Sequence, residues 1–141
     1  MASTAQVTWV GPGMRLVGEA DGPAIVVDHA LPDEDREETG PRPVRLLLIG
    51  LCGCTAMDVI SILQKKRQPF TGLQVKATAE RAEEHPKVYT QIHLEFVVTG
   101  EGVDPAAVER SIELSQTKYC SASAMLGEAA EITTSYRIVE E

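Results

Sequence analysis

Two stretches in the second half of the chain alternate between apolar and polar residues, which is the period of a β-strand with one face in a core. They cover residues 71–81 and 88–99, and a charged connection that contains Pro86 separates them. This pattern predicts two long antiparallel strands with one buried and one solvent-facing side. Residues 131–139 alternate in the same way and predict a closing strand.

Before these strands, residues 44–66 are apolar around nearly the whole helical cylinder. Pro43 suits the first turn of a helix, and Lys65 and Lys66 suit its C-terminal end. A helix that is apolar on most sides is a buried one. The few other predicted elements of the chain are hard to arrange around it, so the pattern also indicates that a second subunit covers part of the helix.

The flanking regions predict shorter elements. Residues 7–9, 14–19 and 24–28 read as three strands separated by turns, and the proline-rich, acidic stretch 31–43 reads as a loop or connector. Asp104 and Pro105 form a helix start, and an inward stripe of Val108, Ile112, Ser115 and Tyr119 follows. Residues 121–126 suit a further short helix. The order predicts an α+β fold in one domain, residues 1–141.

Composition narrows the functional class. The chain has 141 residues and a formal net charge of −8, which argues against binding to a nucleic-acid backbone. The apolar run 44–63 carries Arg45, Asp58 and two glycines, so a membrane span is not expected. The first residues do not resemble a signal peptide, which favours a cytoplasmic location. Three cysteines in a reducing compartment do not form a structural disulfide framework.

The candidate chemistry lies in Cys54 and Cys120, in two segments that both read as helical. Two thiols that folding brings together can reduce a peroxide and close a disulfide. A reactive thiolate needs a nearby positive charge, for which Arg15 and Arg45 are both candidates. The opposing interpretation is that these thiols only fill a core, as free cysteines often do. Cys52 is interpreted in that way, because it points nearly opposite to Cys54 around the helix.

The other residue patterns in the chain predict no cofactor and no metal. The three histidines are scattered and, with the cysteines, give no zinc-ligand spacing. The chain contains neither a glycine-rich phosphate loop nor a Ser-His-Asp elbow.

The segments around the two cysteines, PVRLLLIGLCGCTAMDVISIL and LSQTKYCSASAML, resemble the OsmC/Ohr family of thiol peroxidases. The resemblance runs from about Trp9 to the end of the chain. The stretch VISILQKKRQ, the strand pair after it and KYCS are most similar to a less characterised branch, the YhfA-like proteins.

The resemblance implies an α+β fold of antiparallel sheets on a long buried central helix, assembled as an intertwined homodimer. It implies that Cys54 is the peroxidatic thiol, which becomes a sulfenic acid. Cys120 would then be the resolving thiol, and a dithiol would reduce the Cys54–Cys120 disulfide. The implied substrate is an organic hydroperoxide.

Two positions depart from the family pattern. Arg45 stands where peroxidase members carry a Glu that holds the activating Arg, and Ser121 follows Cys120 where Ohr-type members tend to have Pro. The family's Arg maps loosely to Arg15. The inverted charge at Arg45 motivates a rival hypothesis, a non-catalytic protein on the same scaffold that binds a small ligand or senses redox state.

Overall fold

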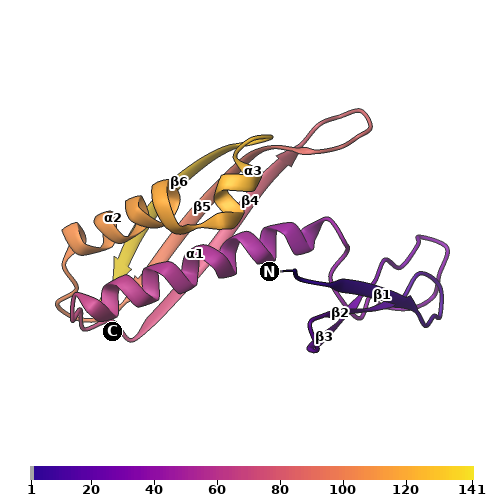
Figure 1. Cartoon of the computed structure of the whole chain (residues 1–141), viewed down its shortest axis with the longest axis horizontal. Helices are drawn as coiled ribbons and strands as arrows, with labels where there is room; N and C mark the ends of the chain where they lie inside the picture. The colour runs from indigo at the N-terminus through magenta and orange to yellow at the C-terminus, as the bar shows by residue number, and fades with distance from the viewer. Residues whose placement is uncertain (1) are drawn as a thin grey trace. The chain divides into compact units, whose positions relative to one another are not determined.

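The computed structural model describes residues 2–141, which form two compact units, and the boundary between them falls within the first helix, between Leu47 and Leu48. The N-terminal unit is a three-stranded antiparallel sheet in the order β1-β2-β3 (Figure 1). Its strands are β1 (Ala5–Trp9), β2 (Leu16–Ala20) and β3 (Ala24–Val27). The three predicted strands are therefore confirmed, with bounds that shift by one or two residues. The stretch 31–43 contains no strand or helix, as predicted.

The C-terminal unit contains a second three-stranded sheet in the order β4-β5-β6 and the helices that cover it. Figure 1 shows α1, α2 and α3 on one side of this sheet. The elements are α1 (Arg45–Lys65), β4 (Gly72–Arg81), β5 (Tyr89–Thr99), α2 (Pro105–Leu114), the π-helix η1 (Ser115–Tyr119), α3 (Ser121–Leu126) and β6 (Glu131–Val139). The Asp104 side chain accepts a hydrogen bond from the Ala106 amide at 3.0 Å, so the predicted helix cap is confirmed.

The expectation of purely antiparallel sheets is wrong for the second sheet. Strands β4 and β5 are antiparallel, but β5 and β6 are parallel, with Ile92 opposite Ile132. The reason is the long crossover of α2, η1 and α3, which returns the chain to the end of the sheet where β5 begins. A parallel pair requires such a connection, and an antiparallel pair does not.

The core of the C-terminal unit lies between its helices and one face of its sheet. The alternation predicted for β5 is confirmed, because Ile92, Leu94, Phe96 and Val98 are all buried. From α2, Val108 and Ile112 pack into the same core. The helical row that faces them is Leu51, Thr55, Val59 and Leu63.

Among the described residues of α1, only those in this row are fully buried. Ile49 and Met57 on other sides of α1 are 55% and 74% exposed. The single chain therefore does not reach the all-round burial that the sequence predicts. By length and composition alone α1, with a mean hydropathy of 2.2, is apolar enough to cross a membrane. Its buried row identifies it as a core helix, because that row packs against the sheet.

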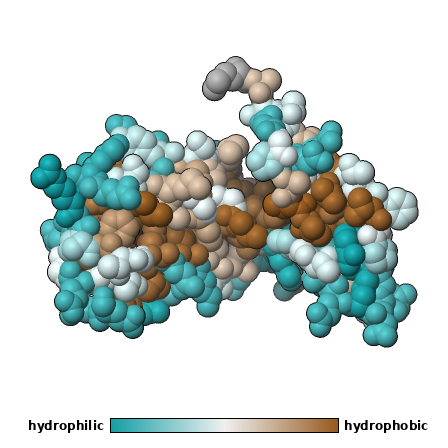
Figure 2. All heavy atoms as spheres, turned by 90° about the horizontal axis from the view of Figure 1, so that it is seen from below, coloured by the Kyte–Doolittle hydropathy of each residue, from teal (hydrophilic) through white to brown (hydrophobic). Residues whose placement is uncertain are grey.

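Apolar side chains are exposed in both units, and Figure 2 shows brown apolar surface on the face that it presents. In the N-terminal sheet, Val7, Trp9 and Ile25 are 63%, 73% and 52% exposed. A hollow of about 580 Å³ lies over this sheet and is lined mainly by apolar residues, among them Val7, Ile25, Val27 and Leu46.

Candidate functional site: two thiols beside a chain of hydrogen bonds

The structure brings Cys54 and Cys120 together in the C-terminal unit. Their sulfurs and a carboxylate oxygen of Asp58 all lie within 4.8 Å of one another. Cys54 and Asp58 are one turn apart on the same face of α1, which is the i, i+4 relationship. Cys120 arrives from the crossover between β5 and β6. Cys54 and Asp58 are half-buried and Cys120 is buried, and all three cysteines are free thiols.

A π-helical turn places Cys120 at this site. The amide of Cys120 donates a hydrogen bond of 2.7 Å to the carbonyl of Ser115, five residues earlier. The wider turn lets Ser115 and Cys120 both face the interior. The expectation that Tyr119 faces inward is wrong, since Tyr119 is 51% exposed. The physical reason is the extra residue in the turn, which a 3.6-residue period does not include.

Cys120 also caps the short helix α3. Its sulfur accepts a hydrogen bond from the Ser123 amide at 3.4 Å. Burial raises the pKa of the Cys120 thiol, the hydrogen bond from the Ser123 amide opposes this rise, and the neighbouring Cys54 adds to it. Within this unit, burial therefore favours the protonated form of the Cys120 thiol.

A chain of hydrogen bonds runs beside the two sulfurs and ends on Asp58. The Ser115 hydroxyl donates to Asp58 Oδ2 at 2.8 Å. Because that bond uses the only Ser115 hydroxyl proton, Thr55 must be the donor in the 2.7 Å contact between the Thr55 and Ser115 hydroxyls. Gln116 Nε2 donates to the Thr55 hydroxyl at 3.1 Å, and the Ser123 hydroxyl donates to Gln116 Oε1 at 3.0 Å.

All donors in this chain therefore point the same way, from Ser123 toward the Asp58 carboxylate. Chains of this kind polarise one another, and each member fixes the orientation of the next. Thr55 and Ser115 are fully buried, so their hydroxyls depend on these partners.

Sequence reasoning did not identify the polar residues of this chain as part of the site. In the structure, Asp58 accepts a hydrogen bond from the Ser115 hydroxyl. One signal was available, since Ser115 lies in the predicted inward stripe and a buried hydroxyl requires a partner. Nothing in the sequence indicates that this partner is on α1.

Cys52 lies apart from this cluster, in a shallow groove between α1 and β4. The groove has a volume of about 450 Å³ and includes Ile49, Gly53, Val75 and Ala77 in its lining. Burial raises the pKa of the Cys52 thiol, against a hydrogen bond with the Ala77 backbone. This placement agrees with a packing role for Cys52 and gives a matched control for Cys54.

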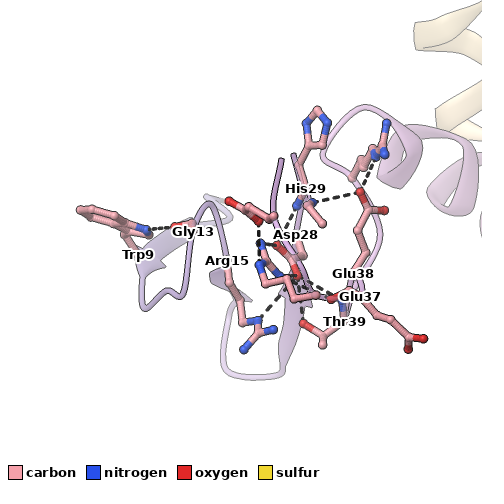
Figure 3. Close-up of polar contacts among 12 residues, drawn as sticks. Trp9, Gly13, Arg15, Asp28, His29, Glu37, Glu38 and Thr39 are labelled. Atoms are coloured by element: carbon pink, nitrogen blue, oxygen red, sulfur yellow. Dashed lines mark hydrogen bonds and ion pairs between the residues drawn. The ribbon is translucent and has the colours of Figure 1, made fainter. Parts of the chain in front are cut away.

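Arg15 lies in the N-terminal unit, beside the buried carboxylate of Asp28 (Figure 3). Arg36 holds both oxygens of Asp28, at 2.7 and 2.9 Å. The amide and hydroxyl of Thr39 and the amide of His29 also donate to this carboxylate. The Arg36 side chain holds the pKa of Asp28 far below its usual range, against the opposing effect of burial.

The contact of Arg15 with Asp28 is much looser than that of Arg36. Arg15 Nε is 3.6 Å from Asp28 Oδ2 and has no hydrogen-bond partner among the described residues. The Arg15 guanidinium is therefore only loosely paired within the N-terminal unit. Arg45 is exposed at the first residue of α1.

Comparison with known proteins agrees with this architecture. A family model described as OsmC-like protein matches residues 35–135. Protein YhfA of Escherichia coli strain K12 is 44% identical over 136 residues, which are 96% of this chain and 97% of that protein.

Solved structures show the same fold. A hypothetical protein from Aquifex aeolicus VF5 has a TM-score of 0.86 at 26% identity, covering all of this chain and 98% of that one. The organic hydroperoxide resistance protein OhrB of Bacillus subtilis has a TM-score of 0.63 at 13% identity, covering 97% and 98% of the two chains.

Proposed function

The chain belongs to the OsmC-like protein family, and on that premise we propose that it is a thiol-dependent peroxidase of organic hydroperoxides. The observation that carries the proposal is the approach of Cys54 and Cys120, with their sulfurs within 4.8 Å. We propose organic hydroperoxides as the substrates because proteins with this fold, such as OhrB of Bacillus subtilis, are named for resistance to them.

The reaction assigns a role to each thiol. The Cys54 thiolate attacks the O–O bond of the hydroperoxide, becomes a sulfenic acid and releases an alcohol after protonation. The Cys120 thiol then attacks this sulfenic sulfur, a disulfide forms and water leaves. A dithiol reductant restores both thiols by exchange. Cys54 is the better nucleophile because it is only half-buried, whereas Cys120 is 3% exposed.

Either Arg15 or Arg45 supplies the activating cation, and two arguments favour Arg15. Its Nε has no hydrogen-bond partner in the part of the chain that the structure describes, because Asp28 is already held by Arg36, Thr39 and His29. Arg45 precedes Cys54 by two and a half turns of a regular helix, which puts the two side chains on opposite faces of it.

We propose a homodimer in the cytoplasm as the working form. Both units expose apolar surface that a second copy would cover, namely the hollow over the N-terminal sheet and the groove beside Cys52. Gly50 and Gly53 support this, because a Cβ at either position would contact nothing within 4 Å in the single chain. A glycine in a helix interior destabilises the helix by about 1 kcal/mol relative to alanine. The close approach of a second subunit at Gly50 and Gly53 would offset this cost.

The test counts free thiols after one equivalent of cumene hydroperoxide is added to reduced protein. We expect the wild type to lose two thiols, Cys54→Ser to lose none beyond a buffer control, and Cys52→Ser to behave as wild type. Catalytic consumption of the peroxide with dithiothreitol as reductant completes the test. Retention of all thiols in the folded wild type would exclude the peroxidase.

The second candidate is a binding protein without thiol chemistry. Arg45, with its inverted charge, and the apolar groove of about 450 Å³ beside α1 favour it. A small apolar ligand that raises the melting temperature of the wild type and of Cys54→Ser equally would support binding. Loss of the effect in Cys54→Ser would favour the enzyme.

A further inference from the structure

We propose that Cys54, Asp58 and Cys120 form a binding site for one Zn²⁺ ion. Two sulfurs and one carboxylate oxygen lie within 4.8 Å of one another in the C-terminal unit. The proposal uses the same sulfurs as the proposed peroxidase, but it does not depend on that activity.

The three donors come from elements whose placement the fold fixes. Cys54 and Asp58 project from one face of α1, one helical turn apart. The hydrogen bond from the Cys120 amide to the Ser115 carbonyl and the bond from the Ser123 amide to the Cys120 sulfur hold the third donor. Two segments that are distant in sequence therefore present three ligands to one point.

The distances suit a small tetrahedral ion. Two sulfurs bound to one Zn²⁺ at about 2.3 Å lie about 3.8 Å apart. The two sulfurs, which are within 4.8 Å of each other, need to close by no more than about 1 Å, and rotation of the cysteine side chains can supply this movement. Zinc would break both S–H bonds, take the sulfurs as thiolates and release two protons to solvent. Three protein ligands leave a fourth position for water.

The donor types select the metal. Thiolates are soft ligands that favour Zn²⁺, while Mg²⁺ and Ca²⁺ require shells of oxygen ligands. A pair of thiolates with one carboxylate is therefore a zinc-type set.

The hydrogen-bond chain supplies the support that metal ligands need. The Ser115 hydroxyl holds Asp58 Oδ2 at 2.8 Å, and Thr55 in turn holds Ser115. Partners of this kind orient the ligand, and their removal costs about 10–100-fold in metal affinity. Ser115 is fully buried, so this orientation does not depend on solvent.

The test titrates Co²⁺, a spectroscopic substitute for Zn²⁺, into reduced, metal-free protein under anaerobic conditions and without peroxide. We expect one equivalent per chain to give a sulfur-to-cobalt charge-transfer band and the intense visible bands of a tetrahedral ion, and Zn²⁺ to displace it. Cys54→Ser should lose the contribution of the Cys54 sulfur to the charge-transfer intensity, and Asp58→Asn should weaken binding at least about 10-fold. Cys52→Ser is the matched control and should bind as wild type.

Circular dichroism establishes that each variant is folded. A second measurement needs no variant: Zn²⁺ should slow the alkylation of Cys54 and Cys120 in the wild type and leave Cys52 unaffected, as read by peptide mass mapping. Absence of the charge-transfer band, an undiminished band in Cys54→Ser, or equal protection of Cys52 would overturn the site. Since no step involves peroxide, loss of the proposed peroxidase activity would leave these results unchanged.

Discussion

The Ser115 hydroxyl donates a hydrogen bond of 2.8 Å to the carboxylate of Asp58, across 57 positions of sequence. This bond joins the end of α2 to α1 beside the two facing thiols. It also sets the direction of the hydrogen-bond chain, because a carboxylate can only accept. The site is therefore a pair of sulfurs next to an oriented polar network within an otherwise apolar core.

Removing the Ser115 hydroxyl should destabilise the protein. Ser115→Ala leaves the Thr55 hydroxyl and Asp58 without their buried partner, and we expect a loss of about 1–3 kcal/mol in the free energy of unfolding. Urea denaturation measures it. Thr117→Ala is the control, because the Thr117 hydroxyl is exposed and donates to the carbonyl of Glu113. Equal losses in the two variants would show that the buried chain contributes little.

The Asp28 carboxylate should make the N-terminal unit sensitive to acid. Its pKa is depressed in the folded state, so its contribution to stability is present above the unfolded pKa of about 3.9 and is lost as the pH falls below that value. Asp28→Asn should therefore be less stable than wild type at neutral pH and should converge with it in acid.

Near-ultraviolet circular dichroism of Trp9, the only tryptophan, reports on this unit as the pH is lowered. Asp33→Asn, at an exposed carboxylate in the same loop region, is the matched control and should follow the wild type. A constant difference in stability between Asp28→Asn and wild type at every pH would contradict the linkage.

Cys120→Ser should stop the proposed peroxidase after a single turnover. Without the second thiol, the Cys54 sulfenic acid has no partner and persists. We expect consumption of one equivalent of hydroperoxide, with dithiothreitol omitted, and trapping of Cys54 by a 1,3-dione followed by mass spectrometry. Wild type should trap much less, because its disulfide closes. If the 1,3-dione instead traps a sulfenic acid at Cys120 in the Cys54→Ser variant, Cys120 is the thiol that reacts with peroxide.

The exposed face of α1 should carry the proposed dimer contact. Met57 is 74% exposed in the single chain, and Met57→Glu would place an unpaired charge in the contact. We expect its dissociation constant to rise at least about 10-fold in sedimentation velocity at micromolar concentration. Gln64→Glu, at an exposed polar position on the same helix, should stay a dimer. If the wild type sediments as a monomer, the proposed homodimer is wrong.

The secondary structure was largely readable from the sequence. The apolar period predicts α1, β4, β5 and β6 with bounds within about one residue of those observed, because burial of one strand face imposes alternation. The start of α2 was equally clear, since Asp104 caps it through a local hydrogen bond. Local signals of this kind depend only on neighbouring residues, so the sequence alone contains them.

Long-range contacts decided the site. The sequence singles out Cys54 and Cys120 as candidates, but their approach depends on a parallel crossover and a π turn, for which the helical period gives no signal. The polar chain from Ser123 to Asp58 is likewise absent from any local pattern, because its partners belong to different segments. The sequence determined which residues could be reactive, and tertiary packing decided which of them meet, since only packing fixes distances between remote segments.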